Sequence, residues 1–182
     1  MRFSFLTALA ALGAVATAQI TSTVVVTNIN TLTVKSQNLI EPAKQLSILN
    51  APQLLLGLGP WPKVIFGFGD IVATATGYIT AMGAAPKIKF WGTEATAIAD
   101  AFRLFVKVHQ QLLDIIIGKG GFLTQIPFVG PPIAAVLRSI EGVVDSIAFG
   151  IIDLVDDTVG AIMRTEYSGL QVKIGVAVKT YA

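Results

Sequence analysis

The stretch Ile98-Ala-Asp-Ala-Phe-Arg-Leu-Phe-Val-Lys-Val-His-Gln-Gln-Leu-Leu-Asp-Ile115 decides the fold. Its apolar residues recur in steps of three and four, at Ile98, Ala101, Phe105, Val108, Leu112 and Ile115. The opposite face is polar and carries Asp100, Arg103, Lys107, Gln111 and Asp114. This spacing is typical of an amphipathic α-helix that packs one face against a core.

Four further segments repeat the same spacing on both sides of this stretch. In the second segment the apolar positions are Ile65, Phe68, Val72, Ala75, Ile79 and Met82. In the last they are Val159, Met163, Tyr167, Leu170, Ile174, Ala177 and Tyr181. Start and stop signals place the five helices at roughly 21–47, 62–82, 94–118, 132–155 and 158–181. Short connections favour antiparallel neighbours. We predict an all-α, single-domain antiparallel bundle of about five helices. The sequence does not decide whether this bundle contains an apolar cavity.

Several residues support these boundaries. Pro62 and the pair Pro131-Pro132 suit first helical turns, and Thr93 suits an N-cap. The glycines of Gly118-Lys119-Gly120-Gly121 are expected to stop the third helix. Pro42 is expected to break or kink the first helix.

Residues 1–18 have the pattern of a signal peptide. A basic start is followed by an apolar centre from Leu6 to Val15 and by the small residues Ala16-Thr17-Ala18. The expected mature domain is therefore 19–182, secreted, and it contains no cysteine. Packing must stabilise it without disulfides.

The composition is unusually apolar. Hydrophobic residues make up 53% of the chain and charged residues 13%, and the mean hydropathy is +0.72. Soluble domains usually have about 25% charged residues. Prolines interrupt the longest uncharged stretches, so we expect no membrane-spanning helix. The near-neutral charge gives no case for nucleic acid. The apolar excess must be buried, used for self-association or used for binding. The sequence does not decide whether the chain forms a homodimer.

Two connections are apolar, although loops are normally polar. In an up-down bundle, 54–62 and 121–130 fall at the same end. We expect an apolar, ligand-binding mouth there, formed by Leu55, Leu58, Trp61, Phe122, Ile126 and Phe128. The alternative is that both loops fold inward and plug the end of the bundle.

Small residues recur every four positions in the second helix, at Gly69, Ala73, Gly77 and Ala81. This stripe is expected either to let another helix approach closely or to form a groove for a ligand. The stripe needs a reason, because glycine inside a helix costs roughly 1 kcal/mol relative to alanine. The sequence does not choose between the two.

Motifs for catalysis are absent from the sequence. No serine has nucleophile-elbow surroundings, and no histidine or cysteine cluster could hold zinc. We expect no enzyme activity, no cofactor and no metal. If an acyl chain is bound, the candidate contacts for its carboxylate are Arg103, Lys107 and His109, the single histidine.

The runs from Asp100 to Lys119 and from Ile133 to Asp145, with the proline-bearing loop between them, carry a resemblance. Together with the leader and the ending Ala177 to Tyr181, they resemble the fungal hydrophobic surface binding protein and cell wall galactomannoprotein family. The resemblance implies an exported helical bundle that adsorbs to hydrophobic surfaces beside secreted esterases, carries a fatty acid inside, or resides in the cell wall. It brings no catalytic residues.

These observations favour a secreted, non-catalytic protein that binds fatty acids or other lipids, or adsorbs to hydrophobic surfaces. The alternative is a structural, O-glycosylated protein of the cell wall. The Thr21-Ser22-Thr23 cluster is the one stretch that invites such sugars.

Overall fold

A computed structural model describes residues 19–50, 52–124 and 130–182, except for the side chains of residues 54, 55, 122 and 123. The expected signal peptide lies outside the described residues. The described chain is helical, with the elements α1 (Ser22–Lys44), η1 (Ile48–Asn50), α2 (Pro52–Leu55), α3 (Pro60–Ala84), α4 (Gly92–Leu123), α5 (Gly130–Ile152) and α6 (Asp157–Tyr181).

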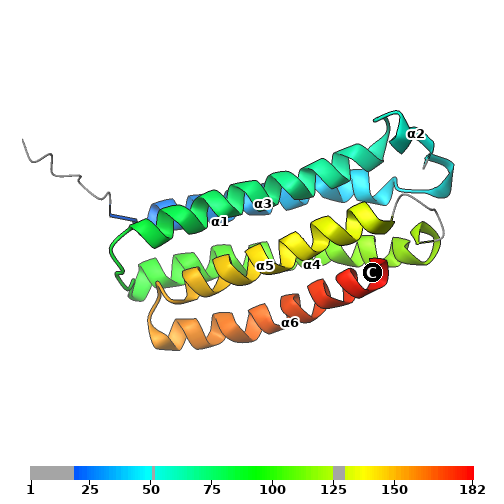
Figure 1. Cartoon of the computed structure of the whole chain (residues 1–182). Helices are drawn as coiled ribbons and strands as arrows, with labels where there is room; N and C mark the ends of the chain where they lie inside the picture. The colour runs from blue at the N-terminus through cyan, green and yellow to red at the C-terminus, as the bar shows by residue number, and fades with distance from the viewer. Residues whose placement is uncertain (1–18, 51, 125–129) are drawn as a thin grey trace, which may run out of the picture.

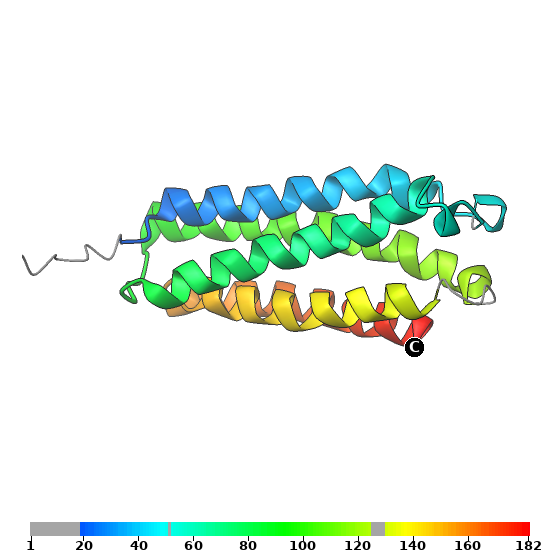
Figure 2. The same ribbon diagram turned by 45° about the horizontal axis from the view of Figure 1, so that its top comes forward.

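Successive long helices run in opposite directions, so the predicted antiparallel all-α bundle is confirmed (Figure 1). The α1–α3 connection, which contains α2, lies at one end of the bundle, together with the end of α4, the start of α5 and the C-terminus. We call this end the α2 end. The α3–α4 and α5–α6 connections lie at the other end (Figures 1 and 2).

The five long helices close a ring. α1 packs against α3 and α4, α6 packs against α4 and α5, and α5 packs against α3. The expectation that short connections join neighbours is therefore right for α5 and α6 but wrong for α3 and α4 and for α4 and α5, which lie across the ring. Each helix has two flanks on its neighbours and a face between them that points into the ring.

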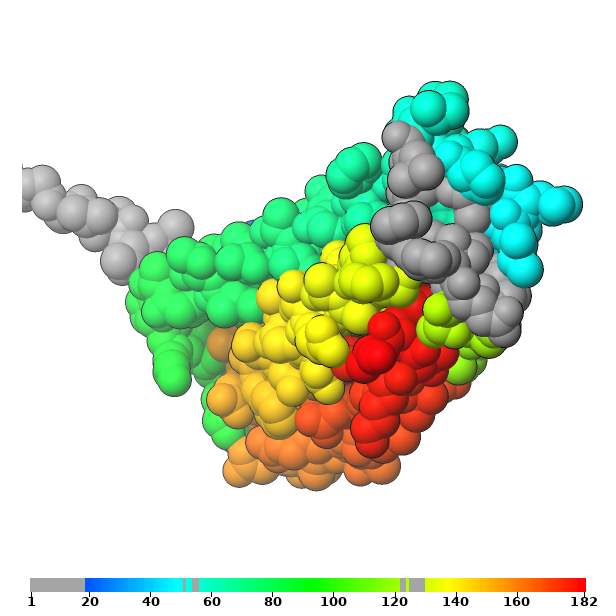
Figure 3. Space-filling model, turned by 45° about the vertical axis from the view of Figure 1, so that its right-hand side comes forward, coloured from blue at the N-terminus to red at the C-terminus, as the bar shows by residue number. Residues whose placement is uncertain are grey.

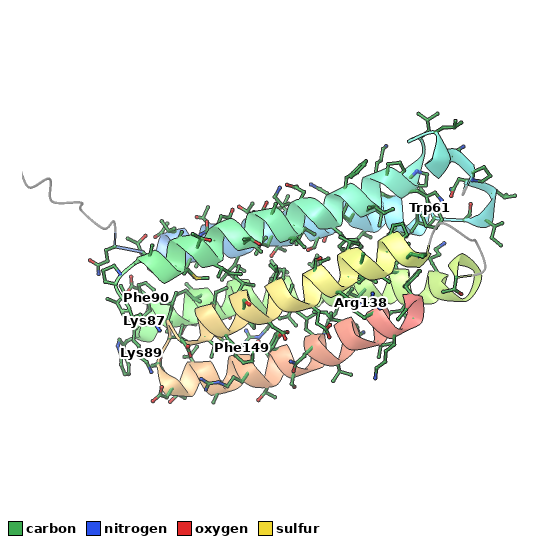
Figure 4. The ribbon with its side chains drawn as sticks, in the orientation of Figure 1. Trp61, Lys87, Lys89, Phe90, Arg138 and Phe149 are labelled. Carbon is green, nitrogen blue, oxygen red and sulfur yellow. The ribbon has the colours of Figure 1, made fainter. Side chains whose placement is uncertain are left out.

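The connection from α3 to α4 can cross the ring because it is tied to the α5–α6 turn. The Phe90 backbone N–H donates to the Leu154 carbonyl at 2.6 Å, and the Asp156 N–H donates to the Phe90 carbonyl at 3.1 Å. The Phe90 side chain is buried. Figure 4 shows Phe90 at this end of the bundle, opposite Trp61. The two connections are thereby fastened to each other.

Helix ends follow local chemistry. The Thr21 side chain accepts from the Val24 N–H at 3.3 Å at the start of α1. The Asp156 carboxylate accepts from the N–H groups of Thr158 and Val159 at 3.0 and 3.1 Å at the start of α6. These bonds satisfy N–H groups that have no partner inside the helix.

Three expected boundaries are wrong. α4 runs through the glycine cluster to Leu123, and a Cβ on Gly120 would lie 2.0 Å from Thr180 Cγ2 of α6. Gly120 thus permits a close helix contact and does not stop the helix. Thr93 lies inside the first turn of α4, and Trp91 is the N-cap residue. Pro42 sits in the last turn of α1, which ends at Lys44 and not at residue 47.

The core is formed by the apolar faces that the spacing predicts, most clearly in α6. Val159 is half-buried, and the other positions predicted for the inner face of α6 are buried. α3 is rotated relative to the prediction, because its buried residues include Val64, Phe68, Ile71 and Ala75, while Ile65, Val72 and Ile79 are half-buried.

α3 contains a long apolar stretch with few charged residues. Within the described ranges it is the one helix long and apolar enough to cross a membrane. Its most apolar 18-residue stretch has a mean hydropathy of 1.4, and 22% of this stretch is buried. A helix of a soluble bundle can meet the same criterion, so the absence of a membrane span stays a prediction.

Candidate functional site

Ser36 and His109 meet inside the helix ring. Ser36 lies near the middle of α1 and His109 near the middle of α4, and Ser36 Oγ is 2.9 Å from His109 Nδ1. Both side chains are fully buried. They are 73 residues apart in the sequence and are brought together because α1 packs along α4.

The flanks of α4 show that His109 points into the ring. One flank faces α6, where Asp114 pairs with Lys173 at 2.6 Å. The other faces α1, where Glu94 accepts from the Ser22 hydroxyl at 2.6 Å. At 3.6 residues per turn, His109 falls on the face between these two flanks.

The corresponding flanks of α1 place Ser36 in the same way. Ser22 lies on the flank toward α4, and Lys35, which pairs with Asp70 of α3, lies on the flank toward α3. Ser36 falls between them on the helical wheel. The Ser36–His109 pair therefore lies at the interior of the ring.

The His109 ring is neutral at ordinary pH. Burial lowers its pKa from 6.5 to about 4, because the charged form loses its hydration there. The ring stacks on Phe105, with the centroids 5.3 Å apart. His109 Nε2 is buried and has no hydrogen-bond partner among the described residues.

Other buried polar groups of the core have partners. The Thr33 hydroxyl donates to the Ile29 carbonyl at 2.9 Å, and the Tyr181 hydroxyl donates to the Ile116 carbonyl at 2.7 Å. The Tyr167 hydroxyl donates to Asp145. Glu166 Oε2 is also unpartnered, but the other oxygen of that carboxylate pairs with Arg103 at 2.6 Å. His109 Nε2 is thus exceptional, since a buried unmade hydrogen bond costs about 1–3 kcal/mol.

The two other residues predicted to contact a carboxylate lie outside the ring. Arg103 is exposed and pairs with Asp100 at 2.7 Å and with Glu166 at 2.6 Å. The hydrogen bond and charge of Glu166 raise the pKa of Arg103. Lys107 is also exposed. Of the three candidates, only His109 faces the interior.

Trp61 lies at the α2 end of the bundle, as Figure 4 shows, and closes that end. Its side chain has no exposed surface, and its indole Nε1 donates to Asn50 Oδ1 at 2.8 Å. The prediction that Trp61 lines an open mouth is therefore wrong, and the inward-folded alternative describes it. The apolar indole gains more from the core than from water.

The rest of the predicted mouth is described only in part. Leu58 is exposed. The side chains of Leu55 and Phe122, and the whole of Ile126 and Phe128, lie outside the described residues. Sequence reasoning missed three further exposed apolar residues at this end, which are Ile48, Leu49 and Leu56. Figure 3 shows the segment that carries them projecting from the bundle, coloured cyan.

The small-residue stripe of α3 faces away from the bundle. Gly69, Ala73, Gly77 and Ala81 are all exposed, and a Cβ on Gly69 or Gly77 would meet nothing within 4 Å. The stripe therefore does not pack closely against another helix of this chain, so that expectation is wrong. That the stripe forms a groove for a ligand stays a prediction.

A cavity of about 200 Å³ lies near the end opposite Trp61. Its walls come from α3, α5, the segment before α1 and the connections that follow α3 and α5, and include Ile20, Ile79, Met82, Gly150 and Leu154. Sequence reasoning missed it. Gly150 lies close to Met82, because an added Cβ would be 3.2 Å from Met82 Cε, and no local sequence pattern marks this contact. Across the described ranges, no three or more His, Cys, Asp or Glu residues form a group that could hold a metal ion.

Two solved structures share this fold. AFMP4P in complex with palmitic acid aligns with a TM-score of 0.65 and 12% sequence identity, over 88% of this chain and 99% of that chain. Ligand binding domain 1 of the Penicillium marneffei MP1 protein, complexed with arachidonic acids, aligns with a TM-score of 0.66 and 15% identity, over 87% and 99%. The likeness shows the fold.

No protein-family model matches the chain, and no curated protein matches it. Membership of the hydrophobic surface binding and galactomannoprotein family therefore stays a prediction. What AFMP4P and the MP1 domain hold is a property of those proteins, and for this chain it is a matter of proposal.

Proposed function

We propose that this chain is a non-catalytic lipid-binding protein that holds a fatty acid inside its five-helix ring. The observation that carries the proposal is an apolar ring interior in a fold shared with two proteins solved with palmitic and arachidonic acid. The apolar composition of the chain supports the same function, because the interior needs no catalytic chemistry to hold a hydrocarbon.

Binding a long acyl chain is energetically reasonable. Burial returns about 0.8 kcal/mol per CH₂, so sixteen carbons supply on the order of 10 kcal/mol before the costs of association. Buried side chains fill the described ring interior. The cavity of about 200 Å³ beside Met82 lies at one end of the bundle and is smaller than the roughly 300–1,000 Å³ of ordinary ligand sites. We expect the ring to widen when a chain enters, at a cost that lowers the affinity.

Native mass spectrometry of the protein secreted from its expression host tests this function. We expect adducts of fatty-acid mass that disappear after solvent extraction, and recovery of them when palmitate is added to the extracted protein. An extracted, folded protein that takes up no palmitate would contradict the proposal.

A matched pair of variants locates the ligand. Val144 is buried on α5 and Val172 is exposed on α6. Val144→Phe fills the ring interior and should abolish palmitate uptake, whereas Val172→Phe adds the same atoms outside and should leave uptake unchanged. Circular dichroism verifies that both variants fold. Equal uptake by both would place the ligand elsewhere.

Adsorption to hydrophobic surfaces is a second candidate function, and the α2 end favours it. Leu49 is 92% exposed and Leu56 is 74% exposed, with Ile48 and Leu58 nearby in the chain. Clustered exposed apolar residues mark contact sites for proteins, membranes or other apolar surfaces. A secreted protein with this end could coat a wax or polyester on which esterases act.

A further inference from the structure

We propose that Ser36 and His109 form the anchor for the carboxyl end of the bound lipid. This inference rests on the proposed function, because it names the polar contact within the same ring. It makes the chain a carrier of free fatty acids in preference to esters or hydrocarbons.

The first argument is the placement of the pair. Ser36 and His109 come from the inward faces of two helices and touch each other across 2.9 Å. The neighbouring buried positions on those faces, such as Leu32 on α1 and Phe102 and Leu112 on α4, are apolar. A ligand with one polar end and a long apolar tail matches a single polar point surrounded by apolar side chains.

The second argument is the unmade hydrogen bond. His109 Nε2 is buried without a partner, and such atoms in native proteins call for an explanation. When the Ser36 hydroxyl donates to Nδ1, the neutral ring carries its proton on Nε2. That N–H can donate to a carboxylate oxygen, and the bond satisfies the group that burial leaves unpaired.

The third argument is charge balance. A carboxylate buried alone is costly, and a histidine can balance it by taking up one proton. At neutral pH, His109 of the free protein is neutral and the free ligand is ionised, so neither of them carries this proton before binding. Binding should therefore take up a proton, and the affinity for palmitate should rise by up to tenfold for each unit that pH falls, within the range where the free ligand is ionised.

Other titratable groups around the pair are already engaged. On α6, Tyr181 donates to the Ile116 carbonyl, and Tyr167 donates to Asp145 of α5. On α1, Lys35 pairs outward with Asp70 of α3. The charged residues of α4 nearest in sequence, Lys107 and Asp114, are exposed, and Asp114 pairs with Lys173 of α6. His109 is the group in this part of the ring that can take the proton.

The single histidine of the chain gives a direct test. In untagged protein labelled with ¹⁵N-histidine, the two nitrogen resonances belong to His109 alone. Addition of palmitate should shift the Nε2 resonance strongly, while methyl palmitate should shift it little. Equal responses to both ligands would overturn the anchor. No uptake of either ligand would instead overturn the proposed function.

Variants give a second, independent readout. His109→Leu should weaken palmitate binding at least tenfold and leave methyl palmitate binding unchanged, and Ser36→Ala should weaken palmitate in the same direction. His109→Gln keeps a side-chain donor and should restore part of the preference. Phe102→Leu, a buried apolar change on the same helix, should affect both ligands alike. Unchanged palmitate binding by a folded His109→Leu or Ser36→Ala variant would contradict the proposal.

Discussion

Asn50 Oδ1 accepts a hydrogen bond from Trp61 Nε1 at 2.8 Å and a second from the Ser47 N–H at 3.1 Å. Asn50 Nδ2 donates to the Gln45 carbonyl at 2.6 Å. One amide side chain thus joins the end of α1, the turn after it and the buried tryptophan that closes the α2 end. The closure depends on Asn50 as much as on Trp61.

Asn50→Ala should loosen this closure. It leaves the buried indole N–H without a partner, which costs about 1–3 kcal/mol. We expect a lower free energy of unfolding in urea, red-shifted Trp61 fluorescence and faster release of bound palmitate. Trp91→Phe, at the other end of the bundle, removes the second tryptophan so that the signal reports Trp61. Unchanged fluorescence and stability would show that Asn50 does not hold the closure.

Stability should fall at acidic pH because of His109. The unfolded chain binds a proton on this residue below its ordinary pKa of 6.5, whereas the folded chain does so only below about 4. The stability is therefore full above pH 6.5 and declines as pH falls from 6.5 toward 4, by a total on the order of 3 kcal/mol for this shift.

Urea unfolding at pH 7.5 and pH 4.5 measures that decline. Carboxylates also titrate in this range, so the difference between the protein and its His109→Gln variant isolates the histidine. We expect a clearly smaller loss in the variant. An equal loss in both proteins would mean that His109 does not govern the acid response.

Substitutions on the solvent face of α3 should stabilise the protein. Gly77 is helical and exposed, and a Cβ there meets nothing within 4 Å. Gly77→Ala should therefore raise the free energy of unfolding by roughly 0.5–1 kcal/mol.

Gly67 is the matched control on the same helix, because its Cβ would lie 2.2 Å from Leu39 Cδ2 of α1. Gly67→Ala should gain less than Gly77→Ala or should destabilise, as thermal or urea unfolding would show. Equal gains at both positions would mean that the α1–α3 contact is looser than described.

Adsorption to apolar surfaces should depend on the α2 end. Leu49→Ser combined with Leu58→Ser removes two exposed apolar side chains, so stability should change by less than about 0.5 kcal/mol. Adsorbed mass on a methyl-terminated sensor should fall severalfold. Trp91→Ser removes an exposed apolar residue at the opposite end and should have little effect. An equal effect of both changes would mean that adsorption is not directed by the α2 end.

The sequence predicts the helices better than it predicts how they face one another. The steps of three and four in α6 identify its inner face, because Met163, Tyr167 and Leu170 alternate with clearly polar residues. α3 is apolar on nearly every side, so periodicity does not fix its rotation, and its predicted inner face was turned. The glycine cluster around Gly120 predicts a helix stop, because a close contact with Thr180 of α6 leaves no trace in local sequence.

The candidate site was predictable only in part. The sequence indicates His109 as a candidate contact for a carboxylate, but its partner Ser36 is 73 residues away, and no local pattern connects them. Arg103 and Lys107 looked equally suitable because they lie near His109 in the sequence. The ring arrangement separates them, since it turns His109 inward and both cations toward solvent.

The backbone hydrogen bonds of Phe90 to Leu154 and Asp156 should make this end of the bundle a hinge. At that end the α3–α4 and α5–α6 connections are bound to each other, whereas the far end is held by side chains such as Trp61 and Asn50. Any splaying of the helices should pivot near Phe90 and grow with distance from it. Amide hydrogen exchange along α4 should accordingly quicken from Ile98 toward Ile116, and an added acyl chain should slow it most at the Ile116 end.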